Sequence, residues 1–286
     1  MAIETSKAPC AALTMVRGNS TFLRLWLTHY RRLLPAEQIY LINDGSTPLP
    51  EDLIAGVNVI NLPMLTLDTD PHGRRWRVMS LWTSGLTQFY NWVLATEVDE
   101  LLVLDPAIGT DLVSYLMVQR EREGVPQVLV PFPVEMVHLP AIEPEPLLEG
   151  AAVIGRRRSY RLNARAARQS ITRVPVEFKE HGQASGARTV DLAPDLYAFR
   201  LAMIDRDLHA AEGPDRAVID ALRHPDALPG LLDRLADSTP VAETLEHAAF
   251  RHRMIEEREA CKGGMIMGGG QSDTCYRLPS RFDGII

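Results

Sequence analysis

Three acidic residues, Glu97, Asp99 and Glu100, lie between two short apolar runs of the sequence, Trp92–Ala95 and Leu101–Leu104. The first run is bounded by polar residues, which predicts a buried strand. Side chains two positions apart on an extended segment point the same way, so Glu97 and Asp99 should share one side. Two carboxylates at a strand end suit a hard divalent cation that leaves positions open for phosphate oxygens. A solvated acidic turn is the alternative.

Another acid, Asp44, lies in a cluster of turn-forming residues, 43–47, that follows a predicted strand at 38–42. In open sheets of parallel strands, ligands bind at the carboxyl ends of the strands. We therefore expect Asp44 and the acidic group at 97–100 to lie at one edge of a sheet.

Basic residues gather in an otherwise acidic chain at 156–168, where six arginines occur in thirteen residues. Arginine forms forked contacts with phosphate oxygens, so this segment is a candidate to hold a pyrophosphate or an anionic acceptor. A solvated helix face that balances local acids is the alternative.

Two histidines, His181 and His209, follow predicted strands at 172–178 and 195–201. Their position favours a ligand or proton-transfer role for at least one of them. Asp205 and Asp207 follow the second of these strands and are candidates for a catalytic base, with a solvated turn as the alternative.

The elements that must position these residues alternate between strand and helix. Strands are predicted at 10–16, 38–42 and 57–62, and a helix whose apolar residues recur at Phe22, Trp26, Tyr30 and Leu33 follows the first strand. A helix begins near Arg74, and another is capped by Thr110 or Asp111. This alternation predicts an α/β fold with a mixed, mostly parallel sheet flanked by helices.

The later part of the chain has two features of its own. A strand at 127–134 carries Pro131 and Pro133, which predicts a position at the edge of the sheet. From 213 onward the pattern becomes helical, with predicted helices at 215–223, 230–236 and 239–261, the last opened by Thr239 and Pro240. We expect a catalytic domain at 1–210 and a helical extension at 211–286.

Composition narrows the classes of function. The 286 residues are 46% hydrophobic and 23% charged, as in a folded globular protein, and the formal net charge of −7 argues against a nucleic-acid binder. No apolar run approaches the roughly 20 residues of a transmembrane helix, which leaves peripheral membrane contact open. The scattered cysteines Cys10, Cys261 and Cys275 suit a reducing cytoplasm.

Four segments together resemble the bacterial family 2-like glycosyltransferases. They are Ala12-Leu-Thr-Met-Val-Arg17, Phe22–Trp26 with His29-Tyr30, Asn43-Asp-Gly-Ser46 and Glu97-Val-Asp-Glu100. The resemblance covers roughly residues 10–205 and implies the GT-A fold, which is Rossmann-like. In the family an Asp-x-Asp motif binds a divalent metal that bridges the diphosphate of a nucleotide sugar. Glu97 stands at the first of these acids and Asp99 at the second.

The resemblance also implies roles for other residues. Asp44 matches the acid that usually contacts the nucleoside, and we expect Val16, Arg17 and Arg77 to contribute to nucleotide binding. The metal, Mn²⁺ or Mg²⁺, would be held by Glu97, Asp99 and His181. Two positions depart from the family pattern, because Gly18-Asn19-Ser20 replaces an acidic pair and Arg200 stands where a histidine is often found.

The predicted function is transfer of a hexosyl group from a nucleotide sugar to a saccharide or lipid-linked acceptor, in bacterial polysaccharide or glycoconjugate synthesis. Asp205, Asp207 and His181 are the candidates for the base that deprotonates the acceptor. A nucleotidyltransferase and a non-catalytic module that binds nucleotide sugars are the alternatives.

Overall fold

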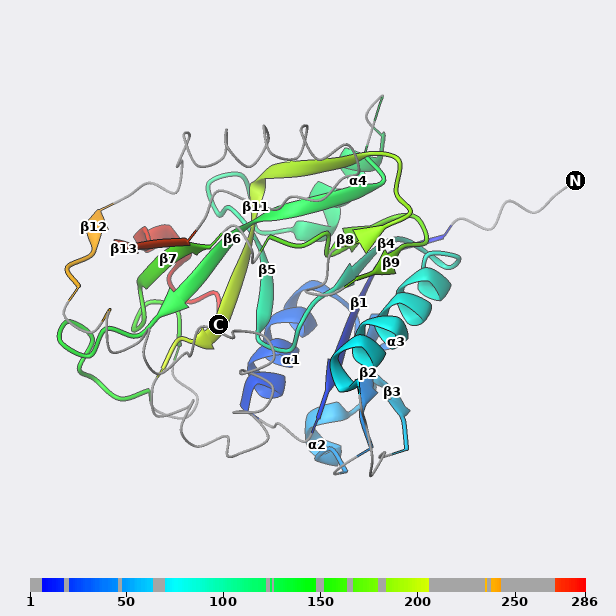
Figure 1. Ribbon diagram of the computed structural model, residues 1–286, viewed down its shortest axis with the longest axis horizontal. Coiled ribbons are helices and arrows are strands. Elements are labelled where there is room, and N and C mark those ends of the chain that lie inside the picture. The colour runs from blue at the N-terminus through cyan, green and yellow to red at the C-terminus, as the bar shows by residue number, and fades with distance from the viewer. Residues whose placement is uncertain are drawn as a thin grey trace, which may run out of the picture. The chain divides into compact units, whose positions relative to one another are not determined.

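The computed structural model describes residues 7–17, 21–45, 48–63, 70–121, 124, 126–147, 152–163, 167–179, 184–205, 235, 238–242 and 271–286. They form an α/β protein (Figure 1). The chain divides into two compact units, each made of separate segments. The first comprises Met1–Val98, Asp111–Pro131 and Arg168–Ala193, and the second Asp99–Thr110, Phe132–Ala167 and Pro194–Ile286. The predicted boundary at residue 210 lies outside the described residues.

The first unit contains the helices and a mixed set of strands. The helices are α1 (Thr21–Leu33), η1 (Ala36–Gln38), α2 (Glu51–Ile54), α3 (Pro71–Leu86) and α4 (Leu112–Glu121). The strands are β1 (Ala8–Val16), β2 (Ile39–Asn43), β3 (Asn58–Asn61), β4 (Tyr90–Ala95), β8 (Ile171–Thr172), β9 (Glu177–Phe178) and β10 (Ala184–Ser185).

The second unit is mainly strand in its described part. It contains β5 (Glu100–Leu104), β7 (Ser159–Asn163), β12 (Val241–Ala242), β13 (Gln271–Arg277) and η4 (Ser280–Phe282). Two long strands, β6 (Val128–Val137) and β11 (Val190–Met203), begin in the first unit and end in the second.

Strand pairing confirms the predicted α/β class and the mixed sheet. In the first unit β1 pairs in parallel with β2 and β4, and β2 pairs in parallel with β3, whereas β8 runs antiparallel to β4 and β6. In the second unit β5–β11, β6–β7 and β7–β13 are antiparallel, and β12–β13 is parallel. The parallel pairs are therefore concentrated in β1–β4, where the sequence alternates strand and helix.

The predicted edge position of the strand with Pro131 and Pro133 is wrong. Strand β6 pairs with β7, β8 and β11, and all ten of its residues are buried. Its pairs with β8 lie at Val128 and Leu129, and its pairs with β7 lie at Glu135 and Met136. Both prolines fall between these two sets, where their missing N–H groups break no ladder bond of either pair.

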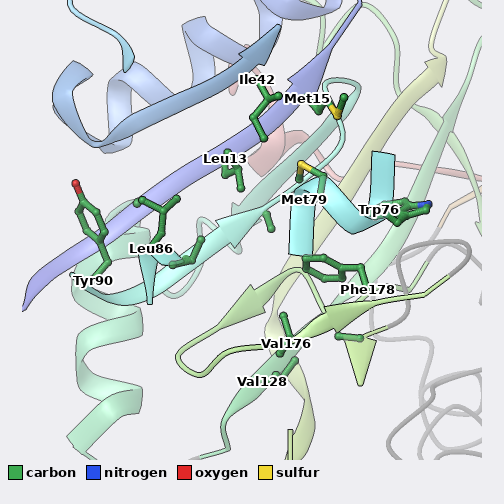
Figure 2. Packing of buried hydrophobic residues seen from close by; sticks show 14 residues of the cluster. Leu13, Met15, Ile42, Trp76, Met79, Leu86, Tyr90, Val128, Val176 and Phe178 are labelled. Carbon is green, nitrogen blue, oxygen red and sulfur yellow. The ribbon is translucent and has the colours of Figure 1, made fainter. Parts of the chain in front are cut away.

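A cluster of buried hydrophobic side chains joins α3 to the sheet of the first unit (Figure 2). Successive residues of a strand face opposite sides, so Ala11, Leu13 and Met15 of β1 all point to the face that α3 covers. Trp76 of α3 packs beside Phe178 of β9, with ring centroids 5.8 Å apart. This packing fixes the start of α3 near the carboxyl ends of the parallel strands.

Helices α1 and α4 are fixed by polar contacts as well as by packing. The indole of Trp26 in α1 donates to the hydroxyl of Thr96, 2.9 Å away, just past the end of β4. Helix α4 begins as predicted, because Asp111 accepts a hydrogen bond of 2.9 Å from the backbone N–H of Ser114. Trp92 of β4 donates to the carbonyl of Leu116 in that helix at 2.9 Å.

Apart from Leu235, which is helical as predicted, the described part of 211–286 does not form the predicted helices. Val241 and Ala242, at the predicted start of a long helix, form β12 and pair with Tyr276 and Arg277 of β13. Val241 is β-branched and favours a strand, and pairing with β13 overrides the start signal of Thr239 and Pro240. The predicted helices at 215–223 and 230–236 and the rest of 239–261 lie outside the described residues, apart from Leu235 and 239–242. No helix in the described ranges is long and apolar enough to cross a bilayer.

Asp105, at the end of β5, is held by Arg281 of the same unit. The guanidinium of Arg281 donates to both carboxylate oxygens at 2.8 Å, and Ala107 N–H and Tyr197 O–H also donate to this carboxylate. Burial by itself would raise the pKa of Asp105, but these hydrogen bonds outweigh burial and lower it from its ordinary value of 3.8.

Candidate functional site

The candidate site lies in the first unit, where three neighbouring parallel strands end. Arg17 follows β1, Asp44 follows β2, and Glu97 lies two residues beyond β4. Because β2, β1 and β4 are adjacent and parallel, these three side chains come from the same edge of the sheet. The predicted convergence of Asp44 and Glu97 on one edge is therefore confirmed.

Asp44 is paired with Arg17. The Nη2 and Nε atoms of Arg17 lie 2.5 and 2.8 Å from Oδ2 of Asp44. The backbone N–H of Asp44 donates to the carbonyl of Val16 at 3.0 Å, which fixes the turn after β2 against the end of β1. No described residue donates a hydrogen bond to Oδ1 of Asp44, so this oxygen can accept one from a ligand. Gly45 continues the chain with φ of 72°, a conformation that glycine adopts without a Cβ clash.

Glu97 lies between two guanidinium groups. Nη2 of Arg75 donates both to Oε2 of Glu97 and, at 2.8 Å, to the carbonyl of Met15 in β1. Nη1 of Arg168 lies 3.3 Å from the other carboxylate oxygen, Oε1. Glu97 is 2% exposed, and burial of an unpaired charge would be costly, so the two arginines account for its presence there.

Aromatic packing holds Arg168 in this position. Its guanidinium carbon lies 5.4 Å from the ring centroid of Trp76, at a distance where a cation–π interaction is effective. Trp76 itself belongs to the hydrophobic cluster beneath α3, as the sequence predicts. Arg75 and Arg168 therefore place two guanidinium groups against the single carboxylate of Glu97.

These side chains do not offer a metal site in the arrangement seen. Both oxygens of Glu97 are occupied by arginines, and Asp99 is fully buried and belongs to the second unit. Within the described ranges no group of three or more His, Cys, Asp or Glu could hold a metal ion, and the predicted third ligand, His181, lies outside them. Metal dependence stays a prediction.

Arg77, predicted to contact the nucleotide, pairs with another residue. Its Nη1 lies 3.0 Å from Oδ2 of Asp70, which also caps α3 by accepting from Gly73 N–H at 2.9 Å. Both side chains are more than half exposed. A nucleotide contact of Arg77 stays a prediction.

Of the three candidate bases, only Asp205 is described. Its Oδ2 accepts hydrogen bonds from Nε and Nη2 of Arg157, at 3.0 and 2.5 Å, and Nδ1 of His138 lies 3.7 Å away. Asp205 is 3% exposed. This geometry gives the carboxylate a structural partner, and Asp207 and His181 lie outside the described residues.

The predicted arginine segment divides between two environments. Arg157, Arg161 and Arg168 are buried and paired with Asp205, Glu135 and Glu97, whereas Arg156 is exposed and Arg158 is partly exposed. Arg161 lies on β7 and not on a helix, so the solvated helix face is wrong for this part of the segment. Arg165 lies outside the described residues.

Sequence reasoning missed a buried polar cluster in the second unit. Glu135 of β6 lies opposite Arg161 of β7, with Nε 2.6 Å from Oε2, and Nη1 of Arg200 lies 4.0 Å from Oε1. Asn163 donates to the same Oε2 at 3.4 Å. The one acid in the apolar strand β6, Glu135, could have predicted this cluster, since a buried carboxylate requires a cation nearby. Arg200, which stands where the family often has histidine, supplies part of that charge.

No protein-family model and no curated protein matches this sequence. Among solved structures, the mannose-1-phosphate geranyltransferase from Thermus thermophilus is similar with 16% identity and a TM-score of 0.27. The match covers 83% of this chain and 66% of that chain, so this chain spans just under two thirds of that structure. At this TM-score the similarity assigns neither a fold family nor an activity.

Proposed function

We propose that the protein binds a nucleotide sugar at the carboxyl ends of β2, β1 and β4 and transfers the sugar to an acceptor hydroxyl. The observation that carries the proposal is the set of charges at this edge. Arg17 and Asp44 form one pair, and Glu97 is shared by Arg75 and Arg168. Asp44, Arg17 and Glu97 follow neighbouring strands of one parallel sheet, and Arg75 of α3 and Arg168, which precedes β8, bring two guanidinium groups to the same edge.

Asp44 supports the nucleoside part of the proposal. Its Oδ1 is available to accept hydrogen bonds from a ribose or base, and Arg17 holds the carboxylate through Oδ2. Arg17 has a side-chain exposure of 35%, so its remaining N–H groups can reach a phosphate oxygen.

Arg75 and Arg168 support the diphosphate part. In the reaction, the bond between the anomeric carbon and the phosphate oxygen breaks, and the electron pair stays on the leaving diphosphate. Fixed guanidiniums stabilise this developing charge without reorganisation, because Glu97, Met15 and Trp76 already hold them in place. The acceptor oxygen bonds to the anomeric carbon and gives its proton to a base.

Asp207 and His181 are the proposed candidates for the base, whereas Asp205 is buried against Arg157 and is a poor proton acceptor in this arrangement. A divalent cation, if bound, would neutralise further charge on the diphosphate.

Calorimetric titration with UDP, GDP and their sugar conjugates tests the proposal. We expect saturable binding of a nucleoside diphosphate in EDTA, since the described site carries arginines, and repetition with Mn²⁺ measures any contribution of the predicted metal. Asp44→Ala, which removes the acceptor oxygens, should weaken binding equally with and without Mn²⁺. Failure of every nucleoside diphosphate and nucleotide sugar to bind would exclude the proposed function.

Product analysis separates the proposed reaction from the two alternatives. Glycosyl transfer releases a nucleoside diphosphate from a nucleotide sugar. A nucleotidyltransferase would instead release pyrophosphate from a nucleoside triphosphate and a sugar phosphate. Binding without either product, over a panel of acceptors, would identify a non-catalytic module.

A further inference from the structure

A cavity of about 500 Å³ in the second unit is lined by four arginines. Arg156, Arg157 and Arg158 precede β7, and Arg277 ends β13. The rest of the lining is Ile142, Glu143, Pro144, Glu145, Gly155 and Ser159. The volume is within the usual range for sites that bind small molecules.

Two of the four guanidiniums already have structural partners. Arg157 is buried and bonded to Asp205, and Arg158 pairs with Asp283. Arg156 is exposed, and its contact is a single hydrogen bond of 3.3 Å to the carbonyl of Pro146. Arg277 is exposed, and its guanidinium makes no hydrogen bond or ion pair with any residue in the described ranges. Arg156 and Arg277 therefore have N–H groups that a ligand can use.

The two acids of the lining differ in the same way. Oε1 of Glu143 accepts hydrogen bonds from Arg158 N–H at 2.8 Å and from the N–H and hydroxyl of Ser159 at 2.9 Å each. These bonds commit Glu143 to holding the wall of the cavity. Glu145 is exposed and has no partner among the residues that the structure describes. The groups left for a ligand are two guanidiniums and one carboxylate.

We propose that this cavity binds a small phosphorylated hydroxy compound of the size of a sugar phosphate. Arg156 and Arg277 supply forked donors that match phosphate oxygens. Glu145 supplies an acceptor for hydroxyl groups, and Ile142 and Pro144 supply apolar surface for C–H groups. The proposal uses no residue of the Asp44 and Glu97 edge and does not rest on the proposed function.

Calorimetric titration of the full chain with glucose 1-phosphate, inorganic phosphate and glucose tests the proposal. We expect the wild type to bind glucose 1-phosphate saturably, more tightly than inorganic phosphate, and not to bind glucose. Arg156→Gln combined with Arg277→Gln should weaken the binding of glucose 1-phosphate at least tenfold, since both charged contacts are lost. The melting temperature should not change, because both side chains are exposed.

Three further variants locate the site. Arg24→Gln removes an exposed arginine of α1 and should bind glucose 1-phosphate as the wild type does. Arg17→Gln should also retain this affinity, since it alters the other unit. Glu145→Gln should lower the affinity for glucose 1-phosphate but not the affinity for inorganic phosphate. The proposal is overturned if the wild type does not bind glucose 1-phosphate, if the double variant binds it unchanged, or if Arg17→Gln removes binding.

Discussion

Arginine residues at the two acidic strand ends carry the proposed binding function, and Arg17 is the most accessible of them. Arg17→Gln should lower the affinity for UDP or GDP by about 10- to 100-fold, because a charge-assisted hydrogen bond contributes roughly 1.5–3 kcal/mol. The free energy of unfolding should change by less than about 1 kcal/mol, since Arg17 is partly exposed. Calorimetry and urea denaturation measure the two effects, with Arg24→Gln as the control. Loss of stability without loss of affinity would assign Arg17 a structural role only.

For Arg161 we expect an effect on stability and not on ligand affinity. This residue lies in the arginine-rich segment 156–168 that the sequence singled out. It is 2% exposed and bonded to Glu135, so Arg161→Met should destabilise the fold by about 3–5 kcal/mol, because the buried carboxylate loses its hydrogen-bonded cation and retains only the more distant Arg200. Urea denaturation measures the loss. Arg161→Met with Glu135→Leu should recover only part of this loss, because buried Arg200 then loses the carboxylate of Glu135. Arg24→Met, at an exposed position of α1, should cost little. An unchanged midpoint in Arg161→Met would contradict the buried ion pair.

Cys10 gives a further prediction at the scale of a single residue. It is fully buried in β1, and burial, with a smaller effect of the Asp111 charge, raises the pKa of its thiol to about 12. The thiolate is the reactive form, so native Cys10 should resist iodoacetamide at pH 8 and become labelled in urea. Mass spectrometry of the alkylated peptides distinguishes the two states. Rapid labelling of Cys10 in the native protein would show that β1 opens.

At the scale of elements, the start of α4 depends on one side chain. Asp111→Ala should cost about 1 kcal/mol of unfolding free energy, because the N–H and hydroxyl of Ser114 lose their acceptor. Asp111→Asn retains an acceptor oxygen and should cost less. Equal losses in the two variants would show that the charge of Asp111, and not the cap, stabilises the helix.

Local pattern was sufficient to predict most elements of the first unit. The strands predicted at 10–16, 38–42 and 57–62 are observed within two residues of their expected bounds as β1, β2 and β3. The patterns that predict these elements are short apolar runs, turn-forming residues and a helical stripe of apolar residues. Each of these patterns is set by residues close together in the sequence. The acidic strand ends were also predictable, because parallel strands place their carboxyl ends together.

Features that depend on distant partners were not predictable in this way. The prolines of β6 lie between its pairs with β8 and its pairs with β7, so they interrupt neither of these two ladders. Glu97 is held by Arg75 and Arg168, which lie 22 and 71 positions away in the sequence. The sequence marked Glu97 and the segment that contains Arg168, yet only the fold shows that Arg75 and Arg168 occupy the oxygens expected to bind a metal.

At the scale of the whole molecule, the Asp105–Arg281 pair predicts how stability depends on pH. The pKa of Asp105 is lowered in the folded state, so the unfolded state binds the proton more readily. The stabilising effect is therefore complete above the ordinary pKa of 3.8 and is lost as the pH falls through the lower folded value. We expect urea denaturation to show that the free energy of unfolding falls less between pH 6 and pH 3 in Arg281→Gln than in the wild type. If the two proteins lost equal free energy over this range, Asp105 would not contribute to acid destabilisation.

The interleaving of the two units limits how this protein can be divided or shuffled. Each unit is assembled from three separate stretches, and the division between units falls inside β6 and β11. No single cut in the gene yields either unit as one continuous polypeptide, so neither can be exchanged as a cassette or expressed by simple truncation. Ribosomal synthesis also delays completion of the first unit until Ala193 has emerged, long after Arg17, Asp44 and Glu97 have been synthesised.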